Sequence, residues 1–187
     1  MDTLTGKLVK LRPIRESDYE FLAALKNDLR TQAWNQRLPP SFTAATMKER
    51  YERSMKRPNT GVFAIETLDG NLVGTMEYRE GPPRLSATIG TIVAMEYWGK
   101  GHGQEAIALV LRFLFQERGL QVVGLWTTSG NVRAMRAAEK LGFRLGARLR
   151  ENSIVDGRPV DSLYMDILRE EFYSSRGMED TLPALGA

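Results

Sequence analysis

The pattern of apolar and polar residues in the first third of the chain predicts one strand and two helices. Residues 7–12 alternate between polar and apolar positions, as in a strand with one buried face. Ser17–Glu20 has the form of a capping box. The run after it places apolar residues on one face of a helix, namely Phe21, Leu22, Leu25 and Leu29. Trp34–Pro40 contains two prolines and is predicted to be irregular, and a second helix is predicted over Ala44–Lys56, because Pro58 cannot continue it.

The middle of the chain predicts a hairpin and a further strand. Val62–Glu66 and Leu72–Tyr78 flank an Asp-Gly pair at 69–70, which is typical of a hairpin turn. After a loop, residues 87–94 predict a strand with Gly90 in its interior, and such a glycine marks a bulge or a close approach by another group. Either interpretation suits a strand that diverges from its neighbour. In that case the main-chain N–H and C=O groups of residues 92–94 would lack a partner strand.

The segment from Gly103 to Gly142 predicts two helices with a strand between them. The first helix has apolar residues along one face, which are Ile107, Val110, Leu111, Leu114 and Phe115. Gly119 is its expected C-cap. Residues 121–128 predict the strand, and Asn131 can cap the second helix, which ends at Gly142.

The C-terminal part of the chain predicts a closing hairpin and a tail. Arg144–Glu151 and Arg158–Leu168 flank a second Asp-Gly pair, which favours a hairpin turn. From Ser174 the residues become small and polar, with glycine among them. We therefore predict a single domain over residues 1–173 and a flexible tail over 174–187.

Composition narrows the class of protein. At 187 residues with 42% hydrophobic and 26% charged residues, the chain suits one globular domain. It contains no apolar run long enough for a membrane span and no signal peptide pattern, so we predict a cytoplasmic protein that does not bind membranes. The absence of cysteine and the single histidine leave little room for a metal site. A net charge of +3 is too small to predict binding to nucleic acid.

Residues 93–104 join a strand end to an amphipathic helix through a glycine-rich loop. Three glycines alternate over five residues, so successive backbone N–H groups can converge on one point. The following helix adds its unpaired N-terminal donors and the positive end of its dipole, and we predict that the loop holds a diphosphate. The loop lacks the G-x-x-x-x-G-K-[ST] spacing of a Walker site. It also lacks the spacing of a Rossmann loop, and the strand over 121–128 ends without an acidic residue.

This loop resembles motif A of the GNAT superfamily of acyl-CoA-dependent N-acetyltransferases. Residues 98–103 match the family pattern [QR]-x-x-G-x-[GA], with Trp98 in place of Gln or Arg. Residues 131–143 are similar to the family's N-x-x-[AS]-x-x-x-x-E-K-x-G-F. The Tyr-Trp-Gly-Lys-Gly sequence at 97–101 and the segment Asp156–Ser162 are most similar to the RimJ/RimL branch. The resemblance covers nearly the whole chain, to about Tyr173.

The resemblance implies a fold, a cosubstrate and a partner. The implied fold is α/β, with a mixed, mostly antiparallel, twisted sheet of about seven strands and helices on both faces. The implied acyl donor is acetyl-CoA, whose pantetheine arm would pair with the main chain near the end of the strand. An amine is the implied acceptor, and a homodimer is left open as the assembly. The residues assigned to CoA are Ile92, Val93, Trp98, Gly99, Lys100, Gly101, His102, Gly103, Gln104, Asn131 and Arg136.

Several of these assignments have a structural alternative. Asn131 is sufficiently explained as a helix cap. Arg136 lies one turn from Lys140, so the two could meet a 3′-phosphate or simply form a solvated face. In GNAT-like proteins the region between the first two helices shapes the acceptor site, which makes Trp34, Asn35 and Arg37 candidate acceptor contacts. The alternative is that Trp34 covers the edge of the core and Arg37 is solvated.

The residues for proton transfer are the least clear part of the sequence. Acyl transfer to an amine needs orientation, a donor to the carbonyl oxygen and a route for the amine proton, and we assign the donor to the N–H of Val93. In the family, the positions of Thr88, Ala134 and Ala138 often carry Glu, Ser and Tyr, and all three of those groups are absent here. Our preferred base is Glu77, on a strand that is otherwise apolar enough to raise its pKa. The alternative is that Glu77 faces solvent or pairs with an arginine.

Two other side chains are candidates for the chemistry. Tyr164 could donate to the departing thiolate, although a core position is the simpler interpretation. His102 carries an imidazole that could act as a base, but it belongs to the glycine loop, so we assign it a backbone role.

The predicted function is therefore transfer of an acetyl group from acetyl-CoA to a primary amine, in a ternary complex. The acceptor is either a protein N-terminus or a small amine. Two alternatives remain open at this point: transfer of another acyl group such as succinyl, and a CoA-binding module without catalysis, since binding and chemistry depend on different residues.

Overall fold

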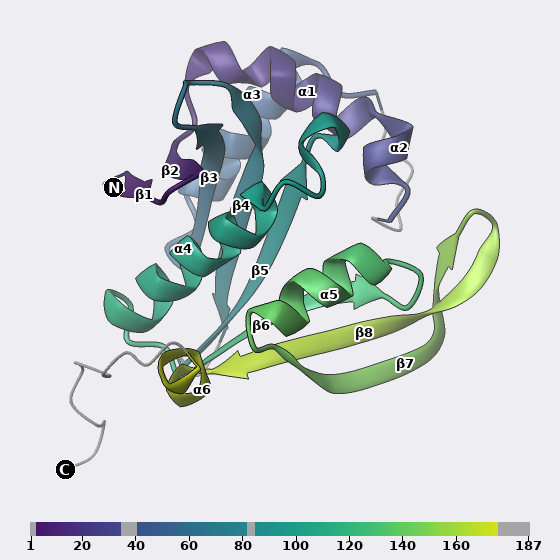
Figure 1. Cartoon of the computed structure of the whole chain (residues 1–187). Coiled ribbons are helices and arrows are strands. Elements are labelled where there is room, and N and C mark those ends of the chain that lie inside the picture. The colour runs from purple at the N-terminus through teal and green to yellow at the C-terminus, as the bar shows by residue number, and fades with distance from the viewer. Residues whose placement is uncertain (1–2, 35–40, 82–84, 176–187) are drawn as a thin grey trace.

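The computed structural model describes residues 3–34, 41–81 and 85–175 and shows a single sheet with helices on both faces (Figure 1). The strand order is β1-β2-β3-β4-β5-β6-β8-β7. All neighbouring pairs are antiparallel except β5 and β6, which are parallel. The predicted mixed, mostly antiparallel sheet is confirmed, with eight strands instead of about seven. The additional strand is β1, whose two residues are too few to produce an alternating pattern.

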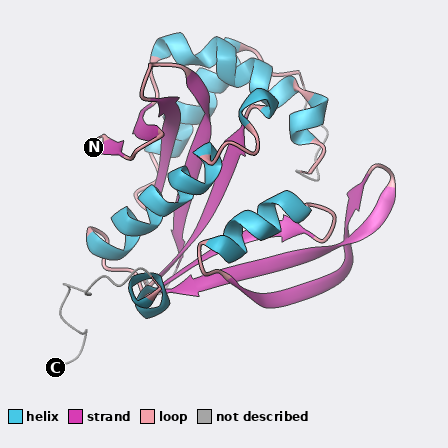
Figure 2. Cartoon of the chain, in the orientation of Figure 1, coloured by secondary structure: helices cyan, strands magenta, loops and turns pink. Residues whose placement is uncertain are grey.

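Most elements lie close to their predicted positions (Figure 2). The strands are β1 (Leu4–Thr5), β2 (Val9–Pro13), β3 (Thr60–Thr67), β4 (Leu72–Gly81), β5 (Ser86–Val93), β6 (Val122–Thr128), β7 (Arg144–Val155) and β8 (Arg158–Leu168). The helices are α1 (Tyr19–Asn27), α2 (Leu29–Gln32), α3 (Ala44–Met55), α4 (His102–Gln116), α5 (Val132–Lys140) and α6 (Arg169–Ser174), with 3-10 turns η1 (Glu16–Asp18) and η2 (Met95–Tyr97).

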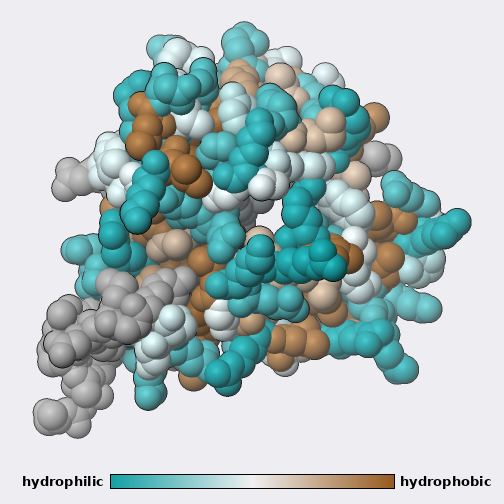
Figure 3. Space-filling view, viewed as in Figure 1, coloured by the Kyte–Doolittle hydropathy of each residue, from teal (hydrophilic) through white to brown (hydrophobic). Residues whose placement is uncertain are grey.

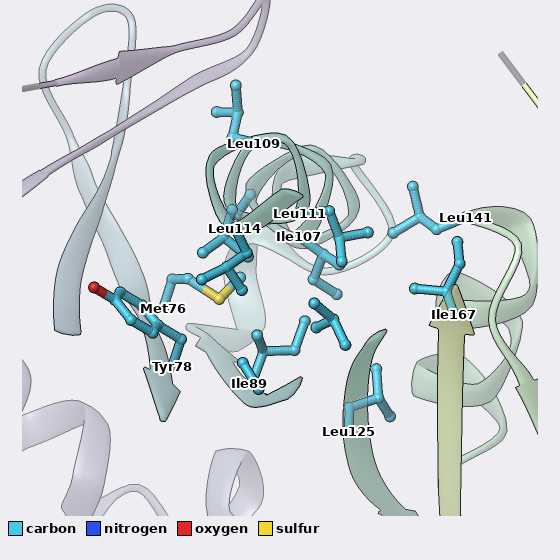
Figure 4. Close-up of a cluster of buried hydrophobic side chains, with 14 of the residues drawn as sticks. Met76, Tyr78, Ile89, Ile107, Leu109, Leu111, Leu114, Leu125, Leu141 and Ile167 are labelled. Carbon is cyan, nitrogen blue, oxygen red and sulfur yellow. The ribbon is translucent and has the colours of Figure 1, made fainter. Parts of the chain in front are cut away.

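The larger core lies between the sheet and α4. All five apolar residues predicted for the inner face of this helix are buried. Figure 4 shows Ile107, Leu111 and Leu114 pointing toward the strands that carry Met76 and Ile89. Burial of an aliphatic side chain contributes about 1.5–3 kcal/mol, so this helix is firmly held against the sheet. The glycine loop at its N-terminus is therefore fixed in position.

A second, smaller core covers the other face of the sheet. Leu22 of α1 and Met47 of α3 are buried there, with Val62 of β3 packed against them. Two predictions for α1 were wrong. The helix ends at Asn27, so Leu29 starts α2 and is exposed instead of extending the apolar face. The cap prediction for Ser17 also fails, because it is the carboxylate of Asp18 that accepts a hydrogen bond, from the N–H of Arg15 at 2.7 Å.

A buried ion cluster joins η1 to the sheet. The guanidinium of Arg12 in β2 donates to both carboxylate oxygens of Asp18, at 2.7 and 3.0 Å. Its Nε donates to Glu66 of β3 at 2.5 Å, and Lys10 forms an ion pair with the other Glu66 oxygen at 2.6 Å. Arg12, Asp18 and Glu66 are each only 4% exposed. Buried charges are tolerated because each is paired and hydrogen-bonded.

Strands β5 and β6 diverge, and this separation opens the sheet. Their parallel pairing runs from Ser86↔Val122 to Ile89↔Leu125 and ends there, although β5 continues to Val93. Figure 1 shows the two strands side by side at one end and separating toward the other. The predicted divergence is thus confirmed, and Gly90 is the first residue of β5 beyond the paired region.

The C-terminal boundary is slightly different from the prediction. Phe172 and Tyr173 of α6 are each 2% exposed, so this helix is anchored in the core. Ser174 still belongs to α6, and the N–H of Ser175 donates to the carbonyl of Glu171 at 3.1 Å. The remainder of the predicted tail lies outside the described residues.

Candidate active site

A cavity of about 640 Å³ lies where β5 and β6 separate. It is bounded by β5, the glycine loop, the start of α4, the end of β6 and α5. Figure 3 shows the surface hollowed near the centre of the view, in the region of α4 and α5. We call it the loop-side cavity, and its lining includes Trp34, Thr91, Val93, Trp98, Asn131, Arg133 and Arg136. Its volume is in the range of small-molecule binding sites.

The glycine loop has the conformation that an anion site needs. Gly99 has φ +73° and Gly101 has φ +86°, a region that residues with a side chain rarely adopt. A Cβ on Gly99 would meet no atom within 4 Å, so the backbone is open at that point. Gly101 is the N-cap of α4, and Gly101, Gly103 and Gln104 line the cavity. The free donors at the start of α4 therefore face a cavity that can hold an anion.

Two residues predicted for this loop occupy different positions. Lys100 does not line the cavity, and its ammonium lies 5.6 Å from the ring centroid of Tyr97. His102 lines the cavity, but its Nδ1 donates to the carbonyl of Tyr97 at 3.3 Å and its ring packs edge-on against the Tyr97 ring. These contacts are consistent with a structural role for His102.

Trp98 connects the end of β5 to α5. Its indole N–H donates to the carbonyl of Val93 at 2.7 Å. The guanidinium carbon of Arg133 lies 3.3 Å from the centroid of the Trp98 ring, a close cation–π contact. Burial lowers the pKa of Arg133, yet stacking on an aromatic face suits a delocalised cation. Arg133 was not among the predicted site residues, although a third basic residue on the helix that carries Arg136 and Lys140 was a signal for it.

The main chain of β5 alternates in direction, which decides which groups face the gap. The N–H of Ala94 donates to the carbonyl of Val73 in β4 at 2.8 Å. In an antiparallel pair, hydrogen-bonded residues alternate with non-bonded ones, so Ile92 also faces β4, where it pairs with Thr75. The main-chain N–H and C=O groups of Thr91 and Val93 point away from β4, toward the gap between β5 and β6. The prediction that residues 92–94 all lack a partner was therefore wrong for Ile92 and Ala94, and Ile92 does not line the cavity.

The α5 side of the cavity carries the second motif. The Asn131 side chain accepts from the N–H of Ala134 at 3.2 Å, which confirms its capping role. Asn131 also lines the cavity, so the cap does not exclude a ligand contact. Arg136 and Lys140 are exposed at the cavity edge, and both line it. With Arg133, three cations of α5 line one side of a cavity whose glycine loop is suited to an anion.

A second cavity, of about 370 Å³, lies on the face of the sheet that carries α1 and α3. We call it the acceptor-side cavity, and its main polar residues are Ser54, Arg57, Glu77, Arg79 and Thr88. It shares Ile89, Gly90 and Trp126 with the loop-side cavity. The gap between β5 and β6 is thus bordered by a cavity on each face of the sheet.

Glu77 lies beside this gap. Glu77 of β4 pairs with Gly90 of β5, and a Cβ on Gly90 would lie 3.1 Å from the Glu77 carboxylate oxygen Oε1. The β4–β5 register is regular at this point, so Gly90 marks a close approach and not a bulge. The Glu77 side chain is exposed, which agrees with the alternative that it faces solvent. The neighbouring Lys26 ammonium has its pKa lowered by burial, an effect that the charge of Glu77 partly offsets.

The remaining candidates fall into three groups. Tyr164 packs against Trp126, with ring centroids 5.1 Å apart, and lines neither cavity, so its role as a thiolate donor is not supported. Trp34 lines the loop-side cavity, and its ring would lie 3.2 Å from a Cβ on Gly130. Asn35 and Arg37 lie outside the described residues.

Glu105 was also missed by the sequence analysis, and it fixes the N-terminal turn against α4. Its carboxylate accepts hydrogen bonds from the backbone N–H groups of Lys7, Leu8 and Val9, at 2.8, 2.7 and 2.8 Å. Leu8 in turn lies against Gly101, since its Cδ1 would be 3.2 Å from a Cβ there. The contact spans almost a hundred residues, so no local pattern could reveal it.

We expect Glu105→Ala to lower the free energy of unfolding by about 2 kcal/mol, because three backbone donors lose a charged acceptor. Chemical denaturation followed by circular dichroism measures this change. Glu117→Ala, at the other end of α4, is the matched control and should change stability by less than about 0.5 kcal/mol. An equal effect of the two substitutions would contradict an anchoring role for Glu105.

Within the described residues, no group of three or more His, Cys, Asp or Glu side chains could hold a metal ion. Among the helices that the structure describes, none combines the length and the apolar character required to cross a membrane.

Comparison with known proteins identifies the family. A family model described as an acetyltransferase (GNAT) domain matches residues 9–144. The prophage-derived N-acetyltransferase YokL of Bacillus subtilis is 31% identical over 92% of this chain and 97% of its own. YdaF of the same species, proposed to be a ribosomal N-acetyltransferase, is 26% identical over 88% of this chain and 93% of its own. The crystal structure of Vibrio cholerae spermidine N-acetyltransferase with CoA and spermine is 25% identical and superposes with a TM-score of 0.81, covering 88% of this chain and 97% of that one.

These similarities extend over the glycine loop, the diverging strands and the two motifs that suggested the resemblance. The chain therefore belongs to the GNAT family of N-acetyltransferases and is of the RimJ/RimL type.

Proposed function

We propose that this N-acetyltransferase moves an acetyl group from acetyl-CoA to a primary amine by direct attack in a ternary complex. The observation that carries the proposal is the end of β5–β6 pairing at Ile89↔Leu125. Beyond it the sheet is open, with a cavity on either face and shared residues at the gap. A donor on one face and an amine on the other can thus meet without covalent attachment to the protein.

The loop-side cavity fits acetyl-CoA. The left-handed glycines and the N-terminus of α4 suit a diphosphate. Arg133, Arg136 and Lys140 provide positive charge for a further phosphate. The Vibrio cholerae relative was crystallised with CoA, which supports the same assignment here. Acetyl-CoA would supply an activated thioester to the gap.

The N–H of Val93 is our proposed donor to the thioester carbonyl oxygen. Alternation along β5 directs it toward the gap, where β6 no longer pairs. The hydrogen bond from Trp98 to the Val93 carbonyl fixes the following peptide, between Val93 and Ala94, and the pairing of Ile92 with Thr75 of β4 fixes the peptide that carries the Val93 N–H. A preorganised donor stabilises negative charge as it develops without further reorganisation. Trp98 thus has a positioning role at the place where the family motif carries Gln or Arg.

Glu77 is our proposed proton acceptor. Its carboxylate lies over Gly90, at the border shared by the two cavities. An amine that enters from the acceptor side would pass this carboxylate. An exposed carboxylate can hold the incoming ammonium and receive its proton directly or through water.

The experiment is release of free thiol from acetyl-CoA by the purified chain, with peptides, polyamines and aminoglycosides as acceptors. We expect turnover with at least one primary amine, and faster transfer from acetyl-CoA than from succinyl-CoA. Isothermal titration calorimetry with CoA is run in parallel. CoA binding without turnover across the panel would contradict the proposal and favour a binding module, whereas the absence of CoA binding would contradict the cofactor site itself.

A further inference from the structure

The acceptor-side cavity contains more positive than negative charge. Its floor is formed by side chains of three adjacent strands, namely Glu77 and Arg79 of β4, Thr88 of β5 and Trp126 of β6. Arg57, in the turn between α3 and β3, forms part of the wall. One carboxylate therefore shares the cavity with two guanidinium groups.

The two arginines are not used by the fold. Both side chains are exposed, and within the described residues no ion pair joins Arg57 or Arg79 to a carboxylate. The next carboxylate along β4, Glu80, is buried and bound by Arg118, with distances of 2.7 and 3.2 Å. The guanidinium groups at the cavity are therefore available to a ligand.

The carboxylate of Glu77 and the guanidinium of Arg79 lie on the same face of β4, far enough apart to bind two different groups of one ligand. Glu77 and Arg79 are two residues apart and point to the same face of the sheet, roughly 7 Å apart along the strand. Glu77 is at the gap, beside Gly90, whereas Arg79 pairs with Thr88 farther from it. An ammonium at Glu77 would thus place the remainder of the molecule toward Arg79 and Arg57.

This charge arrangement disfavours a polyamine. The second ammonium of a polyamine would lie near two guanidinium groups, and Lys26 adds a third cation close to Glu77. Like charges at such distances repel, whereas an anion in the same position would be attracted and could accept the paired N–H groups of an arginine. The cavity therefore differs in charge from what a spermine ligand requires.

We propose that the acceptor is a primary amine with an anionic group, a carboxylate or phosphate, within about one residue length of the reacting nitrogen. The inference rests on the proposed function, because it assumes that the acceptor-side cavity receives the amine. Free amino acids and acidic peptide N-termini share this chemistry. Arg79 and Arg57 bind the anionic group, and Glu77 binds the amine.

The test uses acceptors matched in length but not in charge. The small-molecule series is 4-aminobutyrate, its amide and putrescine, and the peptide series is Ser-Asp, Ser-Asn and Ser-Lys with amidated C-termini. We expect kcat/KM to be at least about tenfold higher for the anionic member than for the neutral one in one series, with the cationic member lowest. The series that responds distinguishes a free amino acid from a peptide.

Variants connect the preference to the arginines. Arg79→Gln and Arg57→Gln should each reduce the ratio of anionic to neutral kcat/KM, and the double variant should abolish it. Arg53→Gln is the control, since Arg53 is an exposed arginine on α3 that does not line the cavity. Preference for the cationic acceptors, or an anionic preference that survives the double variant, would overturn the proposal. Absence of turnover with every acceptor would instead overturn the proposed function on which it rests.

Discussion

Replacing Arg12 with methionine should lower the free energy of unfolding by about 3–5 kcal/mol, the range for removing one partner of a buried ion pair. The substitution leaves the carboxylates of Asp18 and Glu66 buried, each without its guanidinium partner. Methionine fills a similar volume, so the loss reflects the uncompensated charges and not a cavity. Equilibrium unfolding in urea measures the change.

The control for Arg12→Met is an exposed ion pair. Lys48 lies 3.4 Å from Glu16, and both side chains are at least half exposed. Lys48→Met should therefore change stability by less than about 0.5 kcal/mol. If Arg12→Met were equally mild, the cluster would not have the structural role that its burial indicates.

The same cluster predicts a dependence of stability on pH. Burial alone raises the pKa of Asp18, but hydrogen bonds from Arg12 and Arg15 outweigh it, so the pKa is lowered from 3.8. Burial also raises the pKa of Glu66, but the hydrogen bonds and charges of Lys10 and Arg12 outweigh this effect, so the pKa is lowered from 4.5. Carboxylates with a lowered pKa stabilise the fold fully above their unfolded values and lose that contribution as the pH falls through the folded ones. Arg12→Met should remove much of this loss below about pH 4.5.

The local elements were predictable because their signals lie close together in sequence. The capped helix α5, the apolar face of α4 and the two Asp-Gly hairpins each depend on residues within a few positions of one another. The glycine loop was predictable for the same reason. Its left-handed glycines and its place at the start of α4 follow from a six-residue pattern.

The contacts that complete the site depend on distant parts of the chain. Arg133 of α5 stacks on Trp98 in the glycine loop, and Glu105 of α4 binds the turn after β1. The basic residues of α5 indicate that Arg133 can bind an anion, but no local pattern shows that it stacks on Trp98 or that Glu105 binds the turn. The direction of the Ile92 main chain was likewise inaccessible, because it depends on which residues of β5 hydrogen-bond to β4. Alternation of polar and apolar residues predicts a strand, but it does not show which of its residues form hydrogen bonds with a given neighbouring strand.

The position of Glu77 depends both on a local sequence pattern and on contacts between distant parts of the chain. Its strand was predicted correctly, but its exposure was left open between two alternatives, because exposure depends on what covers that face of the sheet. Gly90 was predicted to mark either a bulge or a close approach; the regular register excludes the bulge, and the group that approaches is the Glu77 carboxylate. A glycine on β5 and a glutamate on β4 thus form one feature, at the border of the two cavities.

Glu77→Gln should lower kcat about 100-fold at saturating acceptor, which corresponds to about 2.7 kcal/mol of transition-state stabilisation. Glutamine keeps the size and polarity of the side chain but cannot accept the amine proton. The KM for acetyl-CoA should remain unchanged, because Glu77 lies on the opposite face of the sheet from the glycine loop. Steady-state thiol release measures both constants.

Two further variants separate proton transfer from other effects of the substitution. Glu77→Asp keeps a carboxylate and should recover part of the lost kcat, since a shorter side chain can still reach the amine through water. Glu52→Gln removes an exposed carboxylate of α3 that lines neither cavity and should retain full activity. If Glu77→Gln retained the parent kcat at saturating acceptor, solvent water would be the proton acceptor, and the role of Glu77 would be limited to binding the ammonium, visible as a higher KM for the amine.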